Sequence, residues 1–293
     1  MKIPWLIASV ALAFLSKSSA AEFHLTDKKS NIQSPAIKEA SGLAVSPKNE
    51  NFLWVINDSG GSPELHLIGT DGSERGKVKV TNAKNTDWED LASFTLDGNS
   101  YLLIADTGDN NSKRKSVTLH ILREPKLPAD GQKLDGTVAA DWHIDFTYEG
   151  GPRDCESVAV DSASGKIILI SKRTKPPEVY ELPLRAPKKK GVLVAKKIGQ
   201  TAVTAPVSLP FADQPVSMDI SEDRSLAAVV TYYGVFLFPH KSDESWADAF
   251  SHKPVPLGPH GIGQAESVAI SKDGKSIYVV AEGKNSPIRI YQR

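Results

Sequence analysis

A short motif that recurs five times along the chain is the feature that most constrains its fold. In the clearest copies, Glu156–Asp161 and Glu266–Ser271, an acidic residue and a serine precede alternating apolar and small residues. Three less regular copies are Ser41–Ser46, Glu89–Phe94 and Ser217–Ser221. The positions that align lie 48, 67, 60 and 50 residues apart, at Leu43, Leu91, Val158, Met218 and Val268. Recurrence at this interval indicates one supersecondary unit repeated along the chain.

Each copy of the motif predicts a strand that is followed by a turn and further strands. Turns such as Asp97-Gly98 and Asp273-Gly274 have the residues of tight hairpins. The predicted second strands are Phe52–Ile56, Tyr101–Ala105, Lys166–Ile170, Ser225–Val230 and Ser276–Val280. The predicted third strands are Glu64–Gly69, Val117–Leu122, Glu178–Leu182, Val235–Phe238 and Ile288–Tyr291. Weaker fourth strands are predicted at Gly76–Val80, Asp141–Thr147 and Gly191–Lys197, and we find no sustained helical periodicity.

Repeated units of about four short strands predict an all-β fold, specifically a β-propeller. The repeats give five blades, and the long intervals after Leu91 and Val158 leave room for a sixth. The last unit ends soon after its third strand, so we expect Glu22–Thr26 to supply the missing strand and close the ring. We expect His240–His260 to be a long loop. The alternative, a β-sandwich, does not predict such a repeat.

The N-terminus predicts a secretory signal peptide over residues 1–20, followed by a single domain over residues 21–293. Lys2 precedes an apolar run, Ile3–Leu15, and small residues follow it up to Ala21. The run is shorter than a membrane span, so we expect no membrane insertion after cleavage, and a periplasmic or secreted protein. The alternative interpretation is a buried N-terminal helix.

Composition restricts the kinds of partner. The 35 Lys and Arg residues equal the 35 Asp and Glu residues, which argues against a general attraction to nucleic acid or to an anionic membrane. Cys155 is the only cysteine, so the chain forms no internal disulfide, and a small buried side chain is its expected role. We expect a monomer whose partner is a small anionic or ester substrate, or a protein or glycan ligand.

Polar residues collect where predicted strands begin and end. Because the first and second strands of each unit form an antiparallel hairpin, the start of one and the end of the other lie together. In a propeller the first strand is innermost, so these ends surround one mouth of the central channel. The candidate metal ligands at or near these positions are Glu39, Asn57, Asp58, Glu89, Asp106, Glu156, Asp219 and Glu266.

This set consists of carboxylates and one amide, which are hard oxygen ligands. Several carboxylates in a confined space repel one another unless a cation compensates them. Oxygen ligands without His or Cys suit Ca²⁺ better than Zn²⁺. The set therefore predicts a divalent cation, with Ca²⁺ favoured. The alternative is that these acids pair with Lys172, Arg173 or backbone amides, or cap turns.

The mature chain resembles a group of bacterial secreted β-propellers. The residues that carry the resemblance are Asn57–Gly60, Asp87–Asp90, Gly108–Asn110, Asp154–Glu156, Gln264–Glu266 and Glu282-Gly283. More distantly, the chain is similar to the calcium-dependent propeller hydrolases, namely lactonases and phosphotriesterases of the paraoxonase and gluconolactonase type, and the β-propeller phytases. That similarity implies Ca²⁺ in the channel mouth, with Glu39, Asn57, Glu89, Asp106, Glu156 and Glu266 at comparable places.

Two functions remain open on the sequence. The first is a metal-dependent hydrolase of small esters or phosphoesters, in which Asp90 or Glu282 acts as base and Lys172 or Arg173 holds the anionic group of the substrate. The second is a non-catalytic module that contains a structural ion and docks a protein, glycan or peptide. A flat face with exposed Trp88, Tyr232 and Tyr233 favours docking, and a narrow cleft favours chemistry.

Overall fold

The computed structural model describes residues 23–185 and 191–293. The predicted signal peptide (1–20), Ala21 and Glu22, and the Lys188-Lys189-Lys190 run lie outside the described residues. The described part is all-β apart from one short helix, as the sequence predicted. None of its helices is long and apolar enough to cross a membrane.

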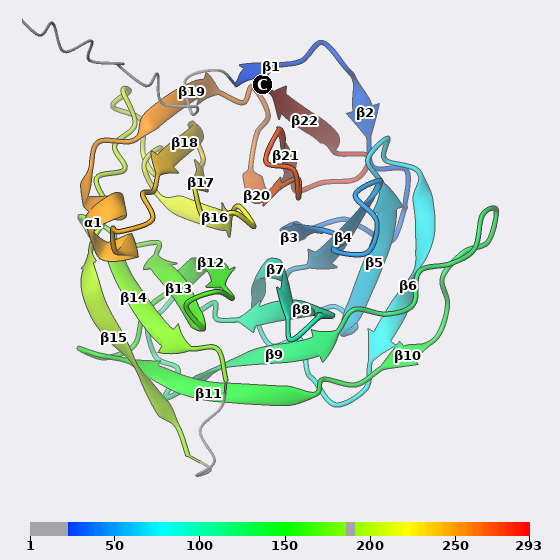
Figure 1. Ribbon diagram of the computed structural model, residues 1–293, viewed down its shortest axis with the longest axis horizontal. Coiled ribbons are helices and arrows are strands. Elements are labelled where there is room, and N and C mark those ends of the chain that lie inside the picture. The colour runs from blue at the N-terminus through cyan, green and yellow to red at the C-terminus, as the bar shows by residue number, and fades with distance from the viewer. Residues whose placement is uncertain (1–22, 186–190) are drawn as a thin grey trace, which may run out of the picture.

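The strands form four sheets arranged around a common centre (Figure 1). The first sheet contains β3 (Ala40–Val45), β4 (Phe52–Asn57), β5 (Glu64–Gly69) and β6 (Glu74–Val80), with β10 (Thr137–Val138) parallel to β6. The second has eight strands, β7 (Trp88–Leu96), β8 (Asn99–Asp106), β9 (Val117–Arg123), β11 (Trp142–Tyr148), β12 (Cys155–Asp161), β13 (Lys166–Ser171), β14 (Glu178–Pro183) and β15 (Leu193–Gln200). Its two antiparallel halves join where β11 pairs parallel with β15.

The remaining two sheets complete the circle. One contains β16 (Pro215–Ile220), β17 (Leu226–Thr231), β18 (Gly234–Pro239) and β19 (Val255–Pro259), with helix α1 (Trp246–Ser251) between β18 and β19. The other contains β20 (Ala265–Ile270), β21 (Ser276–Ala281) and β22 (Pro287–Gln292). The N-terminal strands β1 (His24–Leu25) and β2 (Ser30–Asn31) both pair antiparallel with β22, so the two ends of the chain share one sheet.

Five inner strands form a closed ring of contacts. β3 contacts β7 and β20, and the ring continues from β7 through β12 and β16 back to β20. Every residue of β3, β12 and β20 is buried, which explains their near-continuous runs of apolar and small residues. Gly42 is required where β3 meets β7, because a Cβ at this position would lie 2.6 Å from the backbone nitrogen of Leu91. The ring thus depends on small residues at close approaches.

Each inner strand also carries a β-bulge at the start of the repeated motif. The pairing with the next strand shifts between Ala40 and Gly42, Trp88 and Asp90, Cys155 and Ser157, Pro215 and Ser217, and Ala265 and Ser267. A bulge places one extra residue on its strand and redirects that side chain. The extra residue is Glu89, Glu156 or Glu266 in three of the strands.

The structure corrects one prediction about the strands. The segment His240–His260, expected to be a loop, contains α1 and the edge strand β19. Pro256 and Pro259 weaken the sequence signal for this strand, and an edge is the place in a sheet where proline is tolerated. The weak fourth strands predicted near Gly76, Asp141 and Gly191 correspond to β6, β11 and β15.

Removal of Phe23–Asp27 tests the closure by β1. Phe23 is buried against the core shared by the last two sheets, and β1 covers the edge of β22. We expect the deletion to cost about 3 kcal/mol from the loss of a buried aromatic side chain alone. The melting temperature should fall by roughly 5 to 10 °C. Replacing the exposed Lys28 and Lys29 by alanine is the control, and an equal melting temperature for deletion and control would contradict closure.

Glu178 provides a pH-dependent test of the junction between β14 and β15. Although burial opposes ionisation, hydrogen bonds from Lys197, Tyr180 and Arg153 lower the pKa of Glu178 to about 2. Since this is below the ordinary carboxyl value, the stabilisation is fully present above about 4.5 and disappears as the pH falls through about 2.

We therefore expect Glu178→Gln to lower the free energy of unfolding at pH 7. The difference from wild type should shrink steadily as the pH falls from about 4 toward 2, in denaturant titrations at each pH. Glu50→Gln, at an exposed position, is the control. If the difference in the free energy of unfolding between wild type and Glu178→Gln stays constant across this pH range, the three hydrogen bonds do not act through the charge of Glu178.

Candidate functional site

Three bulged glutamates lie at the end of the ring where the inner strands begin. Glu89, Glu156 and Glu266 stand at the second positions of β7, β12 and β20, and all three are buried. Regular alternation would direct successive side chains to opposite faces of each strand, but the bulge redirects one of them. The repeated acidic position of the motif therefore has a local structural cause.

Glu89 belongs to two groups of carboxylates. With Asp58 and Asp87 it offers oxygens that all lie within 4.8 Å of one another, and the same holds for Glu89 with Asp154 and Glu156. Asp58 follows β4, Asp87 precedes β7 and Asp154 precedes β12. The two groups thus converge from the hairpin ends that the sequence analysis expected to meet.

The second group is already compensated by basic side chains. Arg173 Nε donates to Asp154 Oδ2 at 2.6 Å, and the backbone nitrogen of Asp109 donates to Asp154 Oδ1 at 2.9 Å. Lys172 forms an ion pair with Glu156. Burial raises the pKa of Glu156 to about 7, although Lys172 acts against this. These pairs are the alternative that the sequence analysis left open, and they account for Asp154 and Glu156.

A hydrogen-bonded chain continues from Lys172 to the far side of the mouth. Its Nζ donates to the Tyr232 hydroxyl at 2.9 Å, and that hydroxyl donates to Glu266 Oε1 at 3.0 Å. Burial opposes the charge of Lys172, but Glu156 raises its pKa above the ordinary value, so the ammonium stays protonated. Burial, followed by hydrogen bonding to Glu266 and the charge of Glu266, raises the pKa of Glu282 to about 8. The chain runs from Glu156 on β12, through Lys172 after β13 and Tyr232 after β17, to Glu266 on β20.

The first group contains no ion pair within the described residues, although the Ser59 backbone nitrogen donates to Asp58 and the charges of Lys172 and Arg114 act against the pKa shifts of Asp58 and Asp87. Burial raises the pKa of Asp58, raises that of Asp87 to about 6 and raises that of Glu89 well above its ordinary value, and neighbouring carboxylates add to each shift. Glu89 is only 5% exposed, and within the described residues its side chain has no hydrogen-bond or ion-pair partner. Gly108 covers it closely, since a Cβ there would overlap Glu89 Oε1. This mostly buried carboxylate therefore receives no donor from the described part of the chain.

Other predicted ligands have different positions. Asn57 Oδ1 accepts from the backbone nitrogens of Lys38 and Glu39 at 3.0 and 3.2 Å, so its amide shapes a loop. Asp106 forms an ion pair with Arg114 at 2.7 Å and accepts from the backbone of Thr86 at 3.2 Å. The side chain of Glu39 is exposed near Asp58 and Glu282. These residues surround the uncompensated group without belonging to it.

Asp90 and Asp219 lie away from the mouth. Asp90 is completely buried, and its carboxylate accepts from the backbone nitrogens of Leu91, Val158 and Met218 and from the Ser217 hydroxyl. It therefore connects β7 to β12 and β16 through three of these hydrogen bonds, and the fourth, from Leu91, lies within β7. Asp219 lies near the end of β16, at the opposite end of the ring.

The structure also settles the position of Trp88, whose exposure would have favoured docking, and adds two acids to the predicted ligands. Trp88, considered as part of an exposed face, is 0% exposed and donates to the carbonyl of Lys84 at 2.9 Å. Asp87 and Asp154 were absent from the predicted ligands, although each stands two residues before a motif glutamate. This shared spacing was the sequence signal that could have identified both acids as neighbours of the motif glutamates. It could be interpreted only once the β-bulge at the start of each inner strand was known.

Comparisons with known proteins add no identity to this geometry. No protein-family model matches the chain, and no curated protein matches it at a significant level.

The position of Asp90 predicts a structural role that can be measured. Asp90→Ala leaves three buried backbone N–H groups without their acceptor, so we expect a loss of about 3 kcal/mol or more in the free energy of unfolding. Asp90→Asn keeps one acceptor oxygen and should cost less. Ser217→Ala is the comparison variant: it removes the hydroxyl donor to Asp90 and the acceptor of the Val268 nitrogen, and should cost less than Asp90→Ala. Chemical denaturation that finds Asp90→Ala as stable as wild type would contradict this role.

Proposed function

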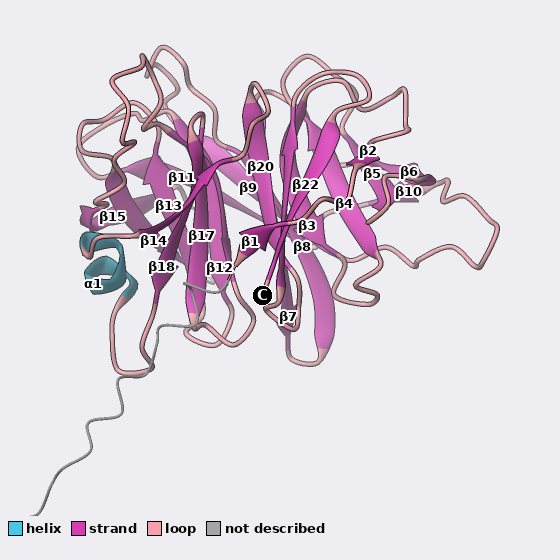
Figure 2. Ribbon diagram, turned by 90° about the horizontal axis from the view of Figure 1, so that it is seen from above, coloured by secondary structure: helices cyan, strands magenta, loops and turns pink. Residues whose placement is uncertain are grey.

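We propose that this chain is an exported five-bladed β-propeller that binds a divalent cation, with Ca²⁺ favoured, between Asp58, Asp87 and Glu89. The closed ring of five inner strands, each starting a hairpin of the same order, supports the propeller (Figure 1). Seen from the side, the strands run between two faces formed by loops (Figure 2). Its eight-stranded sheet then corresponds to two blades whose outer strands, β11 and β15, pair with each other. Export is proposed from the N-terminal sequence alone.

The observation that carries the proposal is Glu89. A buried carboxylate without a donor is costly, and two more carboxylates beside it increase the cost. A divalent cation removes both costs because it ligates the oxygens and neutralises the charge. Carboxylate oxygens, with backbone carbonyls or water completing the shell, are the ligands that Ca²⁺ accepts.

The activity we propose is hydrolysis of a small ester or phosphoester. When bound, the ion would polarise an oxygen of the substrate and lower the pKa of a ligated water. Arg173 is part-exposed beside Asp154, so its guanidinium is available to an anionic group of the substrate. Lys172 is held by Glu156 and Tyr232 and positions those groups at the mouth. Glu282, half-buried beside Glu266, is the carboxylate at the mouth that can exchange a proton with solvent.

A docking function is the second candidate, and one surface favours it. The segment between β15 and β16 exposes three large apolar side chains, Val207, Leu209 and Phe211, of which Leu209 is 66% and Phe211 59% exposed. The segment enters β16 at the same end of the ring as the candidate site. Exposed apolar side chains gathered beside a polar site are common in protein-binding surfaces. In this case the ion is structural and the face binds a protein, glycan or peptide.

The test uses the opposite effects of one substitution on the ion-free and ion-bound protein. Glu89→Gln removes repulsion, so the variant should melt at a higher temperature than wild type in a chelator. It should also bind Ca²⁺ at least tenfold more weakly, because it lacks one anionic ligand. Glu39→Gln, at an exposed position nearby, is the matched control and should change the affinity less than about twofold. Calorimetric titration and thermal melts with Ca²⁺, Mg²⁺ and Mn²⁺ supply the measurements.

Turnover then separates the two functions. Wild-type protein assayed on a panel of esters, lactones and phosphoesters should show activity that the chelator abolishes and that Glu89→Gln lacks. Activity absent from a protein that binds Ca²⁺ would favour docking. Purified wild-type protein that contains no divalent metal, and that melts identically with and without chelator, would contradict both the bound cation and the metal-dependent hydrolase. The docking function would then remain.

A further inference from the structure

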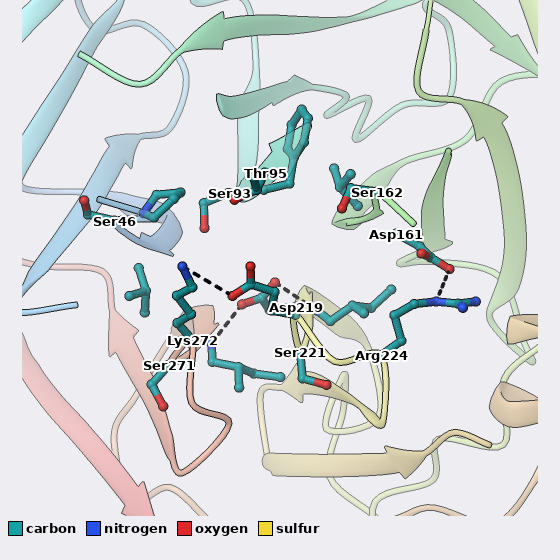
Figure 3. A pocket seen from close by; sticks show the side chains of 17 residues that line it. Ser46, Ser93, Thr95, Asp161, Ser162, Asp219, Ser221, Arg224, Ser271 and Lys272 are labelled. Carbon is teal, nitrogen blue, oxygen red and sulfur yellow. Dashed lines mark hydrogen bonds and ion pairs between the residues drawn. The ribbon is translucent and has the colours of Figure 1, made fainter. Parts of the chain in front are cut away.

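A pocket at the opposite end of the ring provides a second, separate site. It is formed where the five inner strands end, and Figure 3 shows polar side chains from all five strand ends around it. The pocket contains about 590 Å³ of empty space, part of which opens to solvent. Its apolar wall consists of Val45, Phe94, Val160, Ile220 and Ile270. The site is thus independent of the acidic mouth, which lies at the starts of the same strands.

The charged side chains that line this pocket pair with one another, with one exception. Arg224 Nε donates to Asp161 Oδ2 at 2.9 Å, and Trp246 donates to the same oxygen at 3.0 Å. Lys272 and Glu222, both about half exposed, lie 3.9 Å apart. Four of the five ionisable side chains that line the pocket therefore form two neutral pairs.

Asp219 is the exception. Its two oxygens accept from the backbone nitrogens of Ile220 and Ile270, each at 2.8 Å, and no basic side chain pairs with it in the described part of the chain. Each carboxylate oxygen can accept a further hydrogen bond. The side chain is part-exposed and lines the pocket, so this remaining capacity is available to a ligand. The pocket therefore combines one uncompensated carboxylate with apolar walls.

We propose that this pocket binds a small organic ammonium ion, whose cationic head contacts Asp219 and whose short apolar body contacts Phe94 and the neighbouring aliphatic side chains. An anionic ligand would face the unpaired negative charge. A divalent metal ion would find a single free carboxylate, which is fewer anionic oxygens than such ions usually require. The hydroxyls of Ser93, Thr95 and Ser162 surround the pocket and can accept the further N–H groups of a primary ammonium.

Two probes of equal length test the charge requirement on the unmodified protein. n-Butylammonium and 1-butanol differ mainly in the charge of the head group. Titrations at pH 8 are appropriate because burial raises the pKa of Asp219 to about 7, so its carboxyl is mostly ionised there. We expect saturable binding of the ammonium at roughly millimolar concentration, as expected for a ligand of five heavy atoms, and at least tenfold weaker binding of the alcohol. Equal responses to the two probes would overturn the proposal.

Substitutions locate the site. Asp219→Asn keeps the shape and removes the charge, so it should weaken ammonium binding at least tenfold. Asp243→Asn, at an exposed position outside the pocket, is the matched control and should change it less than twofold. Titrations in a chelator and with Glu89→Gln should give the wild-type affinity, because the acidic mouth is at the other end of the ring. Binding that Asp219→Asn retains, or that Glu89→Gln abolishes, would show that the pocket is not the site.

Discussion

The bulge at the start of each inner strand is the constraint on which the arrangement of this protein depends. It gives two adjacent residues, Glu89 and Asp90, different surroundings: Glu89 faces carboxylates at the mouth, whereas Asp90 reaches across the centre of the ring. β16 is not the neighbour of β7 in the ring, yet Asp90 accepts hydrogen bonds from it. A regular strand would place these two side chains on opposite faces, and neither contact set would form.

Compensation of charge explains why the mouth has two unequal halves. Lys172 and Arg173 directly follow β13, so their ion pairs reach Glu156 on the adjoining inner strand β12 and Asp154 just before it. The equivalent places after β4 are occupied by Asp58 and Ser59, which add an acid rather than a base. The same position in the repeat therefore has opposite charge in two units, and the uncompensated half is where a cation is required.

The sequence predicted those features that follow from repetition and alternation. The inner, second and third strands and three of the fourth strands were found because their apolar patterns are regular. The meeting of Glu89 with Glu156 followed from hairpin geometry. β19 was missed because prolines obscure its pattern. Asp219 was assigned to the wrong end because three residues along an inner strand are enough to carry a side chain from one end of the ring toward the other. Contacts between different repeat units decide which acids have a basic partner. The spacing of residues within one unit therefore could not predict that Asp58, Asp87 and Glu89 lack one.

The network below the mouth separates the two ends of the ring. Ser217 Oγ donates to Asp90 and accepts from the backbone nitrogen of Val268, so hydrogen bonds connect β7, β12, β16 and β20 in one layer. Fully satisfied buried networks are rigid, because any displacement leaves polar groups without partners. Ligands at the two ends can then influence each other only by displacing this layer, since the charges themselves are separated by the length of the inner strands. A substitution in the layer, unlike one at either end, is therefore the kind of change that can alter both sites together.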